Sequence, residues 1–190
     1  MAVAVLLPPA LQYHVMSILN EAATLLIGAG VAAGAAAIYF GRTKFFKKQQ
    51  THEDDVVYVR QTWALVAPDL QGAGDLFYAT LFAMEPSLKT GVFGKSDMKV
   101  QPLRLMQMVD GAIKLLDQPD VLIPTLLKLG ERHIYYNVKP EHYPVVGKAL
   151  IATLQKALGA KMTPEVTTAW LHIYGIIQDT MIKGAQQASR

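Results

Sequence analysis

The sequence predicts an all-helical protein in which one transmembrane helix precedes a single helical domain. Its 190 residues are enough for one ordinary domain and a short accessory segment. From residue 56 onward there is neither the alternation of apolar and polar residues typical of strands nor an Asn-Gly hairpin signal. Prolines instead divide this part of the chain into helical pieces, at Pro68, Pro86, Pro119, Pro140 and Pro164.

The predicted transmembrane helix covers residues 22–40, AATLLIGAGVAAGAAAIYF, which contain no charged side chain. At about 1.5 Å per residue this stretch is just long enough to cross the hydrocarbon core of a bilayer. The aromatic and basic sequence GRTKFFKKQQ follows it, so we expect a single-pass protein whose main domain lies on the cytosolic side. A cleaved targeting sequence is the alternative, although no Lys or Arg precedes the apolar stretch as in a secretory signal.

The excess positive charge lies beside this apolar segment. Residues 1–50 carry four Lys or Arg and one acidic residue, whereas the remaining 140 residues carry 14 basic and 14 acidic side chains. This distribution argues against nucleic-acid binding by the main domain. Because the polar sequence THEDD begins at Thr51, we expect residues 1–50 to form a membrane anchor with a basic juxtamembrane segment, and residues 51–190 to form the helical domain.

Apolar residues in this domain recur at spacings of three and four, as in amphipathic helices: Leu103, Met106, Val109, Ile113, Leu116, and after Pro140 also Val146, Leu150 and Leu154. The sequence Thr163-Pro164-Glu165 predicts a helix start, with a capping hydroxyl, a proline in the first turn and a carboxylate near the positive end of the dipole. The chain has no Cys, so nitrogen or oxygen atoms would hold any metal.

Several separate blocks of sequence then carry a family resemblance. They are LFYATLFAMEP from Leu76, Val92-Phe93, Gln101 to Met106, LGERHIYYNVKPEHYPVVGKAL from Leu129, and TAWLHIYG before the C-terminal helix. In order and spacing they resemble the single-domain globins related to bacterial flavohaemoglobins and neuroglobins, over about residues 54–187. The resemblance implies a globin fold, the 3-over-3 helical sandwich, with haem b as its cofactor.

The resemblance makes His133 the proximal ligand of the haem iron, which needs one strong nitrogen donor. One helical turn earlier, the carbonyl of Leu129 is placed to accept the other imidazole N–H. Tyr143 resembles the tyrosine that the family carries on this side of the haem, and a plain core role is its alternative. We expect His142 to be exposed and His172 to be a structural or surface residue.

On the distal side the resemblance implies roles for Tyr78, Gln101, Leu105 and Phe93. Gln101 stands where these globins carry Gln or His, Leu105 lies one turn further on, and Phe93 matches the phenylalanine that stacks on the porphyrin. The phenol of Tyr78 and the carboxamide of Gln101 both offer hydrogen bonds to bound O2. Because Gln binds iron less readily than His does, we expect an open or water-bound site.

Two features depart from the family pattern. Pro102 directly follows Gln101, so the distal helix either begins near Asp97 and is kinked by the proline, or begins at Pro102 with Gln101 as its cap. Residues 180–187 lack the glutamate that flavohaemoglobin-type sites place beside the proximal His, and Asp179 is the nearest acidic residue. Without that glutamate, the proximal histidine donates electron density to the iron less strongly than peroxidase-like chemistry requires.

Three hypotheses follow for function. The favoured one is a membrane-anchored globin that binds O2 reversibly for storage, transport or sensing, with CO and NO as further ligands. The second is a nitric oxide dioxygenase that relies on a separate reductase. The third is a haem-free helical domain that keeps only the globin shape, which the presence of His133, Phe93, Gln101 and Tyr78 disfavours.

Overall fold

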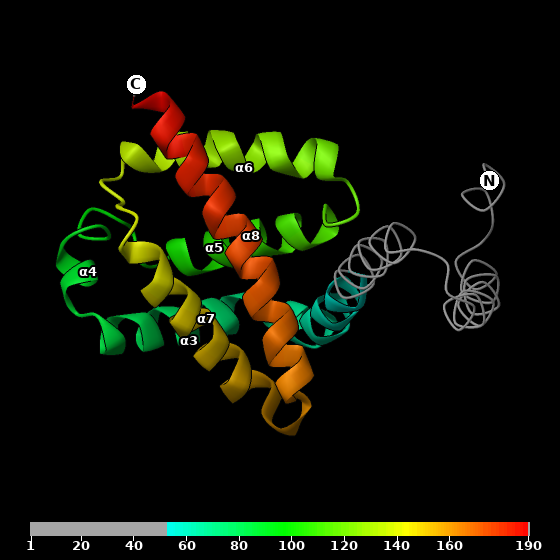
Figure 1. The fold of residues 1–190 in the computed structure, drawn as a ribbon. Helices are drawn as coiled ribbons and strands as arrows, with labels where there is room; N and C mark the ends of the chain where they lie inside the picture. The colour runs from blue at the N-terminus through cyan, green and yellow to red at the C-terminus, as the bar shows by residue number, and fades with distance from the viewer. Residues whose placement is uncertain (1–52, 190) are drawn as a thin grey trace, which may run out of the picture. The chain divides into compact units, whose positions relative to one another are not determined.

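Helices make up most of the computed structural model, which describes residues 53–189 (Figure 1). No strand occurs in this range, so the all-helical prediction is confirmed for it. The predicted membrane span at residues 22–40 lies outside the described residues, and none of the helices within residues 53–189 has the length and hydropathy needed to cross a bilayer. The elements are a helix at 53–66, η2 (Ala67–Asp69), α3 (Leu70–Met84), α4 (Ser87–Thr90), α5 (Gln101–Lys114), α6 (Pro119–Ile134), α7 (His142–Leu158), η3 (Gly159–Lys161) and α8 (Pro164–Ala188).

Short polar side chains fix the starts of α3 and α8. The Asp69 carboxylate accepts a hydrogen bond from the N–H of Gly72 at 2.8 Å, which satisfies one of the free donors in the first turn of α3. The Thr163 hydroxyl accepts one from the N–H of Val166 at 3.4 Å. The predicted cap of the last helix is therefore confirmed, with Pro164 in the first turn, where its missing N–H costs nothing.

The start of α5 resolves the question raised by Pro102. The helix begins at Gln101, so Pro102 is its second residue and does not kink it. Gln101 is consequently the first helical residue and not the cap. Its N–H donates to the carbonyl of Asp97 at 2.9 Å, so a turn ahead of the helix holds its backbone. The side chain of Gln101 thus leaves α5 from a defined position in the first turn.

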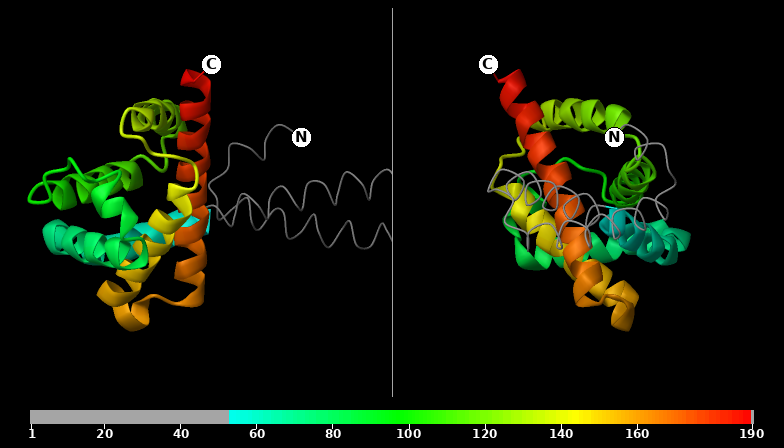
Figure 2. Two further views of the ribbon diagram at one scale, coloured as in Figure 1. Left: turned by 90° about the vertical axis from the view of Figure 1, so that its left-hand side faces the viewer. Right: turned by 45° about the vertical axis from the view of Figure 1, so that its right-hand side comes forward.

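The helices pack in a crossed arrangement. In Figure 1, α7 and α8 cross in front of α3, α5 and α6, and the side view in Figure 2 shows α8 on one side of these helices. The closest pairs are α6 with α8, α3 with α5, and α3 with α7. The 53–66 helix is bonded to α8, because the indole N–H of Trp170 donates to the Thr62 hydroxyl at 3.0 Å inside the core.

Two glycines allow α6 and α8 to cross in backbone contact. A Cβ atom added at Gly130 of α6 would lie 1.9 Å from the carbonyl oxygen of Met181, and one added at Gly184 of α8 would lie 2.0 Å from that of Leu127. Both distances are far below van der Waals contact, and the neighbouring atoms are backbone that cannot turn away. The crossing therefore fixes α6, the helix that carries His133, at a short distance from α8.

We expect Gly130→Ala to lower the free energy of unfolding by about 2 kcal/mol or more, because the added methyl group must push α6 away from α8. Urea denaturation followed by circular dichroism measures the change. Gly111→Ala in α5 is the matched control: no atom lies within 4 Å of its added Cβ, so helix propensity predicts a neutral or slightly stabilising effect. Equal stability of the Gly130→Ala variant and the parent would contradict the close crossing.

Candidate functional site

The residues expected to form the site come from five segments of the described chain. α3 supplies Tyr78, the segment after α4 supplies Phe93, α5 supplies Gln101 and Leu105, α6 supplies His133, and α7 supplies Tyr143. α5 and α6 are not among the closely packed helix pairs of residues 53–189, and they run apart from each other in Figures 1 and 2. α5, which carries Gln101, and α6, which carries His133, thus lie on opposite sides of the space between them.

His133 is oriented by its own helix. Its ring atom Nδ1 lies 2.8 Å from the carbonyl oxygen of Leu129, so Nδ1 carries the proton and donates it to that oxygen, as predicted. The ring is half-buried, and burial lowers the pKa of His133 below its ordinary value despite the hydrogen bond. Within residues 53–189 no hydrogen bond reaches the other nitrogen, Nε2. The neutral ring therefore presents the lone pair of Nε2 as a metal donor.

The end of α6 holds His133 in place through a Schellman motif. Asn137 has a left-handed backbone with φ of 57°, and its N–H donates to the carbonyl of Ile134 at 2.9 Å. The N–H of Val138 donates to the carbonyl of His133 itself at 3.1 Å. These two bonds satisfy free carbonyls of the last turn and turn the chain sharply towards α7. The sequence interpretation missed this motif, for which the Asn ahead of Val138 is the available signal.

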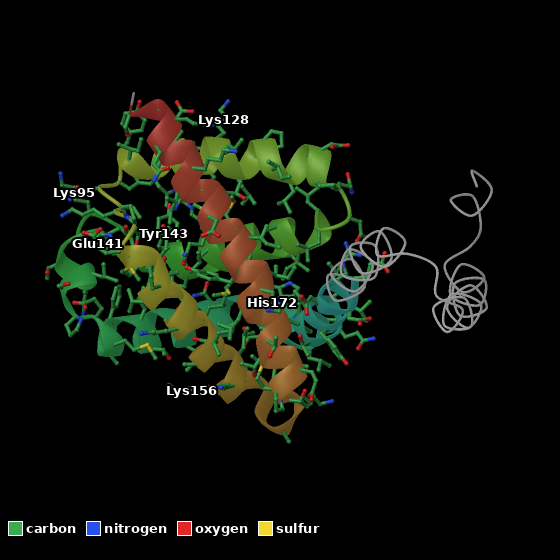
Figure 3. The ribbon with its side chains drawn as sticks, viewed as in Figure 1. Lys95, Lys128, Glu141, Tyr143, Lys156 and His172 are labelled. Carbon is green, nitrogen blue, oxygen red and sulfur yellow. The ribbon has the colours of Figure 1, made fainter. Side chains whose placement is uncertain are left out.

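Tyr143 lies beside His133 at the start of α7, where Figure 3 labels it. The two ring centroids are 6.4 Å apart and the planes are inclined by 26°, which is a stacked arrangement. The Tyr143 ring is buried, and burial raises the pKa of its phenol. The Tyr174 hydroxyl, from α8, donates to the backbone carbonyl of Tyr143 at 2.6 Å, a contact that sequence reasoning did not find. Tyr143 is therefore fixed to α8 and packs against the histidine.

The distal side contains a direct hydrogen bond between two predicted site residues. The Nε2 amide of Gln101 donates to the hydroxyl oxygen of Tyr78 at 3.2 Å. Tyr78 is 3% exposed, and burial raises the pKa of its phenol, only partly offset by the hydrogen bond from Gln101. The phenol consequently keeps its proton at neutral pH. Because it already accepts from Gln101, its own O–H is available to donate to another group.

Aromatic rings set the position of the Tyr78 phenol. The Phe93 ring meets the Tyr78 ring edge-on with centroids 5.2 Å apart, and Phe77 does so at the same separation. Phe82 lies 5.5 Å from Tyr78 and 5.8 Å from Phe93. Edge-to-face pairs of this kind are favourable beyond the area that they bury. Phe93 and the partly buried Leu105 thus add apolar walls beside the two polar groups.

The other two histidines of the described chain have structural partners. Nδ1 of His172 lies 3.0 Å from a carboxylate oxygen of Asp55, which links α8 to the 53–66 helix and confirms its expected structural role (Figure 3). The N–H of Lys139 donates to Nδ1 of His142 at 3.1 Å. His142 is half-buried by this turn, so the expectation that it is exposed was wrong. No group of three or more metal-binding side chains occurs in residues 53–189.

Among residues 53–189 no carboxylate is hydrogen-bonded to the proximal histidine. Asp179 is exposed on α8, and none of the hydrogen bonds among residues 53–189 joins it to His133. The proximal imidazole is therefore bonded to a neutral carbonyl and has no carboxylate partner in the described part of the chain. This arrangement makes the ring a weaker electron donor than a carboxylate-bonded histidine would be.

Comparison with known proteins identifies the class. The globin family model matches residues 76–181, which is more than half of the chain, and this protein belongs to the globin family. It is 35% identical over 121 residues to a flavohemoprotein of Bacillus subtilis, matching 60% of this chain and 30% of that protein. It is 33% identical over 108 residues to a flavohemoprotein of Chromobacterium violaceum, matching 56% of this chain and 26% of that protein. The chain thus spans less than a third of the length of these two relatives.

A solved structure supports the fold. The hexacoordinated heme protein of an anhydrobiotic tardigrade superposes with a TM-score of 0.63, covering 70% of this chain and 94% of that protein at 19% identity. The residues present here fit the haem of the globin family, because a single imidazole nitrogen without a hydrogen-bond partner is offered from one side and two polar donors lie on the other. Family and donor set together support the predicted haem cofactor.

Proposed function

We propose that this chain is a membrane-anchored haem globin that binds O2 reversibly. His133 would hold the iron through Nε2, and haem, when bound, supplies an iron atom with one position open to a diatomic gas. The observation that carries the proposal is the hydrogen bond from Gln101 to the buried Tyr78, at 3.2 Å. It leaves the Tyr78 O–H free to donate to the ligand on the side opposite His133.

The proximal side favours reversible binding over O–O bond cleavage. Cleavage is promoted by a strongly electron-donating axial ligand. The His133 ring donates its Nδ1–H to the neutral carbonyl of Leu129 and so gains little negative charge. The Tyr143 ring, nearly parallel to the imidazole at 6.4 Å, adds no charge beside it. A weakly donating, well-oriented histidine is suited to holding a ligand and releasing it unchanged.

The distal side favours retention of O2 over CO. Bound O2 carries partial negative charge and gains from a hydrogen-bond donor, whereas bound CO gains much less. The Tyr78 phenol is such a donor, because burial raises its pKa and keeps it protonated. The amide of Gln101 polarises the phenol further by donating to its oxygen. We therefore propose O2 as the physiological ligand, with NO and CO as competitors.

Membrane attachment is part of the proposal and rests on the sequence. Residues 22–40 would span the bilayer, and the basic residues that follow would keep the globin domain on the cytosolic side. Such a tether would hold the gas-binding domain close to the membrane surface. Delivery to, or sensing at, that surface is the proposed role.

Nitric oxide dioxygenation is the second candidate, favoured by the 35% identity to a flavohemoprotein. It would use the same distal donors, Tyr78 and Gln101, to hold O2 while NO reacts with it. Every turnover would also need an electron from a reductase. Adding NO to the oxygenated protein, with and without an electron donor, separates the two functions: repeated NO consumption supports the enzyme, and a single conversion supports the gas carrier.

The absorption spectrum of the purified protein tests the cofactor. We expect a Soret band that shifts on reduction and a stable oxygenated form in air. His133→Ala should lose the Soret band after haem reconstitution, because it removes the nitrogen donor. His172→Ala is the matched control, since its ring is bonded to Asp55 on another face, and it should keep the band. A parent protein that fails to take up haem would overturn the proposal.

Two distal variants test the O2 site. Tyr78→Phe removes the donor to the ligand, and Gln101→Leu removes the group that polarises it, so we expect each to speed O2 release. Loss of one hydrogen bond worth about 1.4 kcal/mol corresponds to a roughly tenfold faster rate. Stopped-flow displacement of O2 by CO gives the rate. Tyr58→Phe, on the 53–66 helix, is the control, and unchanged release in both distal variants would exclude the proposed donors.

Truncation tests the anchor. Removing residues 1–50 should give a protein that stays in solution without detergent, with the same Soret band and O2 release rate as the full chain. The full chain should remain with the membrane fraction after a carbonate wash, which strips proteins held by charge alone. If the full chain is washed off, residues 22–40 do not span the bilayer. If only the full chain binds haem, the domain boundary at residue 50 is wrong.

A further inference from the structure

The distal hydrogen bond between Gln101 and Tyr78 depends on how closely two helices approach each other. Its donor lies on α5 and its acceptor on α3, and the two atoms are 3.2 Å apart. This separation is at the long end of the ordinary range for an N–H···O bond, so an increase of roughly 0.4 Å already breaks it. The spacing of α3 and α5 therefore decides whether the pair forms.

Gly74 brings α3 against the backbone of α5. A Cβ atom added at Gly74 would lie 2.5 Å from the carbonyl oxygen of Pro102 and 2.8 Å from the Cβ atom of Pro102. Both residues are buried, and the proline ring fixes φ, so the carbonyl has little freedom to turn away. The approach of the two helices at this point thus requires a residue without a side chain.

This contact adjoins both members of the hydrogen-bonded pair. Pro102 follows Gln101 in the first turn of α5, and Gly74 lies one turn ahead of Tyr78 on the same face of α3. Real Cβ atoms stay at least 3.0 Å from such neighbours, so a side chain at Gly74 must widen the 2.5 Å contact by about 0.5 Å or more. The same movement along the bond takes Gln101 and Tyr78 from 3.2 Å to roughly 3.7 Å, beyond hydrogen-bond distance.

Contacts on its other sides hold α3 in place. The Lys156 amine of α7, labelled in Figure 3, donates to the buried hydroxyl of Thr80 at 3.2 Å. The Phe93 ring packs edge-on against the Tyr78 ring, with centroids 5.2 Å apart. Tyr78 is therefore fixed by groups outside α5 and does not follow α5 when that helix moves.

The far end of α5 is also fixed. The indole N–H of Trp63, on the 53–66 helix, donates to the carboxylate of Asp110 at 3.0 Å. Because this end is held, a side chain at Gly74 would tilt the start of α5 outward. Gln101 lies in that first turn, so its amide would move away from the fixed Tyr78.

We propose that Gly74 is a positioning residue of the distal site, an inference that rests on the proposed O2 binding. By letting α5 approach α3 closely, Gly74 gives the Gln101 amide its reach to Tyr78. The polarised phenol then donates more strongly to bound O2, and O2 leaves more slowly. Gly74 has no side chain with which to contact a ligand, so it acts only through these two residues.

A double-mutant cycle in the full-length haem protein tests this assignment, with O2 release measured by stopped-flow displacement with CO. We expect Gly74→Ala to release O2 roughly tenfold faster than the parent, as is expected of Gln101→Leu. The variant with both substitutions should be no faster than Gln101→Leu alone, because the bond that Gly74 supports is already absent. Parent-like release by Gly74→Ala, or two effects that multiply, would overturn the proposal.

The nuclear magnetic resonance signal of the Gln101 side-chain amide gives a reading that does not depend on gas release. In the CO complex of the isotope-labelled full chain, this signal should shift in Gly74→Ala as it does in Tyr78→Phe, which lacks the acceptor. Gly111→Ala in α5 is the matched control: no atom lies within 4 Å of its added Cβ, so the signal and the release rate should stay as in the parent. An unmoved signal in Gly74→Ala would contradict the positioning role.

Two further results separate this inference from the haem function. If the chain takes up no haem, the haem function fails first, and the amide signal of the haem-free chain still decides whether Gly74 sets the bond. If Gly74→Ala does not fold, Gln101→Asn tests the spacing without adding an atom to the crossing, because its side chain is shorter by one methylene group. We expect Gln101→Asn to release O2 as fast as Gln101→Leu. Release at the parent rate would show that the spacing of α3 and α5 does not limit the bond, and the proposal would fail.

Discussion

The chemistry of the proximal site depends on the hydrogen bond from Nδ1 of His133 to the carbonyl of Leu129. It fixes the tautomer and leaves Nε2 without a proton. It costs the helix little, because the carbonyl one turn earlier is within reach of a side chain on the same face. Burial lowers the pKa of the ring and favours its neutral form, which alone can bind a metal. The other contacts on the proximal side hold α6, and with it the histidine, in position.

Three features of the fold keep α6 in position. Gly130 and Gly184 bring α6 and α8 into backbone contact, so the helix cannot shift sideways without a clash or a void. The Schellman motif fixes the end of α6 at its other boundary. Tyr174 then joins α8 to the carbonyl of Tyr143, whose ring stacks on the imidazole. α8 therefore positions the proximal histidine twice, once through its backbone and once through Tyr143.

The sequence predicts contacts between residues close together in the chain better than contacts between residues far apart. The bond between Leu129 and His133 and the cap at Thr163 span one turn, so residue spacing alone predicted them. The start of α5 was left open, because both Asp97 and Pro102 are residues at which a helix can begin. The turn in which the Gln101 N–H donates to the Asp97 carbonyl decides between them, and it follows from the folded backbone. The contact between Tyr174 and Tyr143 joins residues 31 positions apart and follows only from the packing of α7 on α8. Family resemblance supplied the roles of the distal residues, which periodicity could not.

The two sides of the site are built on different principles. On the distal side, aromatic rings enclose the hydrogen-bonded pair of Tyr78 and Gln101. The strength of Tyr78 as a donor therefore depends on the exclusion of water. A more exposed Tyr78 would hydrogen-bond to solvent, and its bond to a ligand would be weaker. The proximal side is anchored by backbone contacts and opens towards solvent through Tyr136. The proposed gas ligand would thus lie against the buried Tyr78–Gln101 pair, whereas the imidazole that would hold the iron lies beside a half-exposed ring.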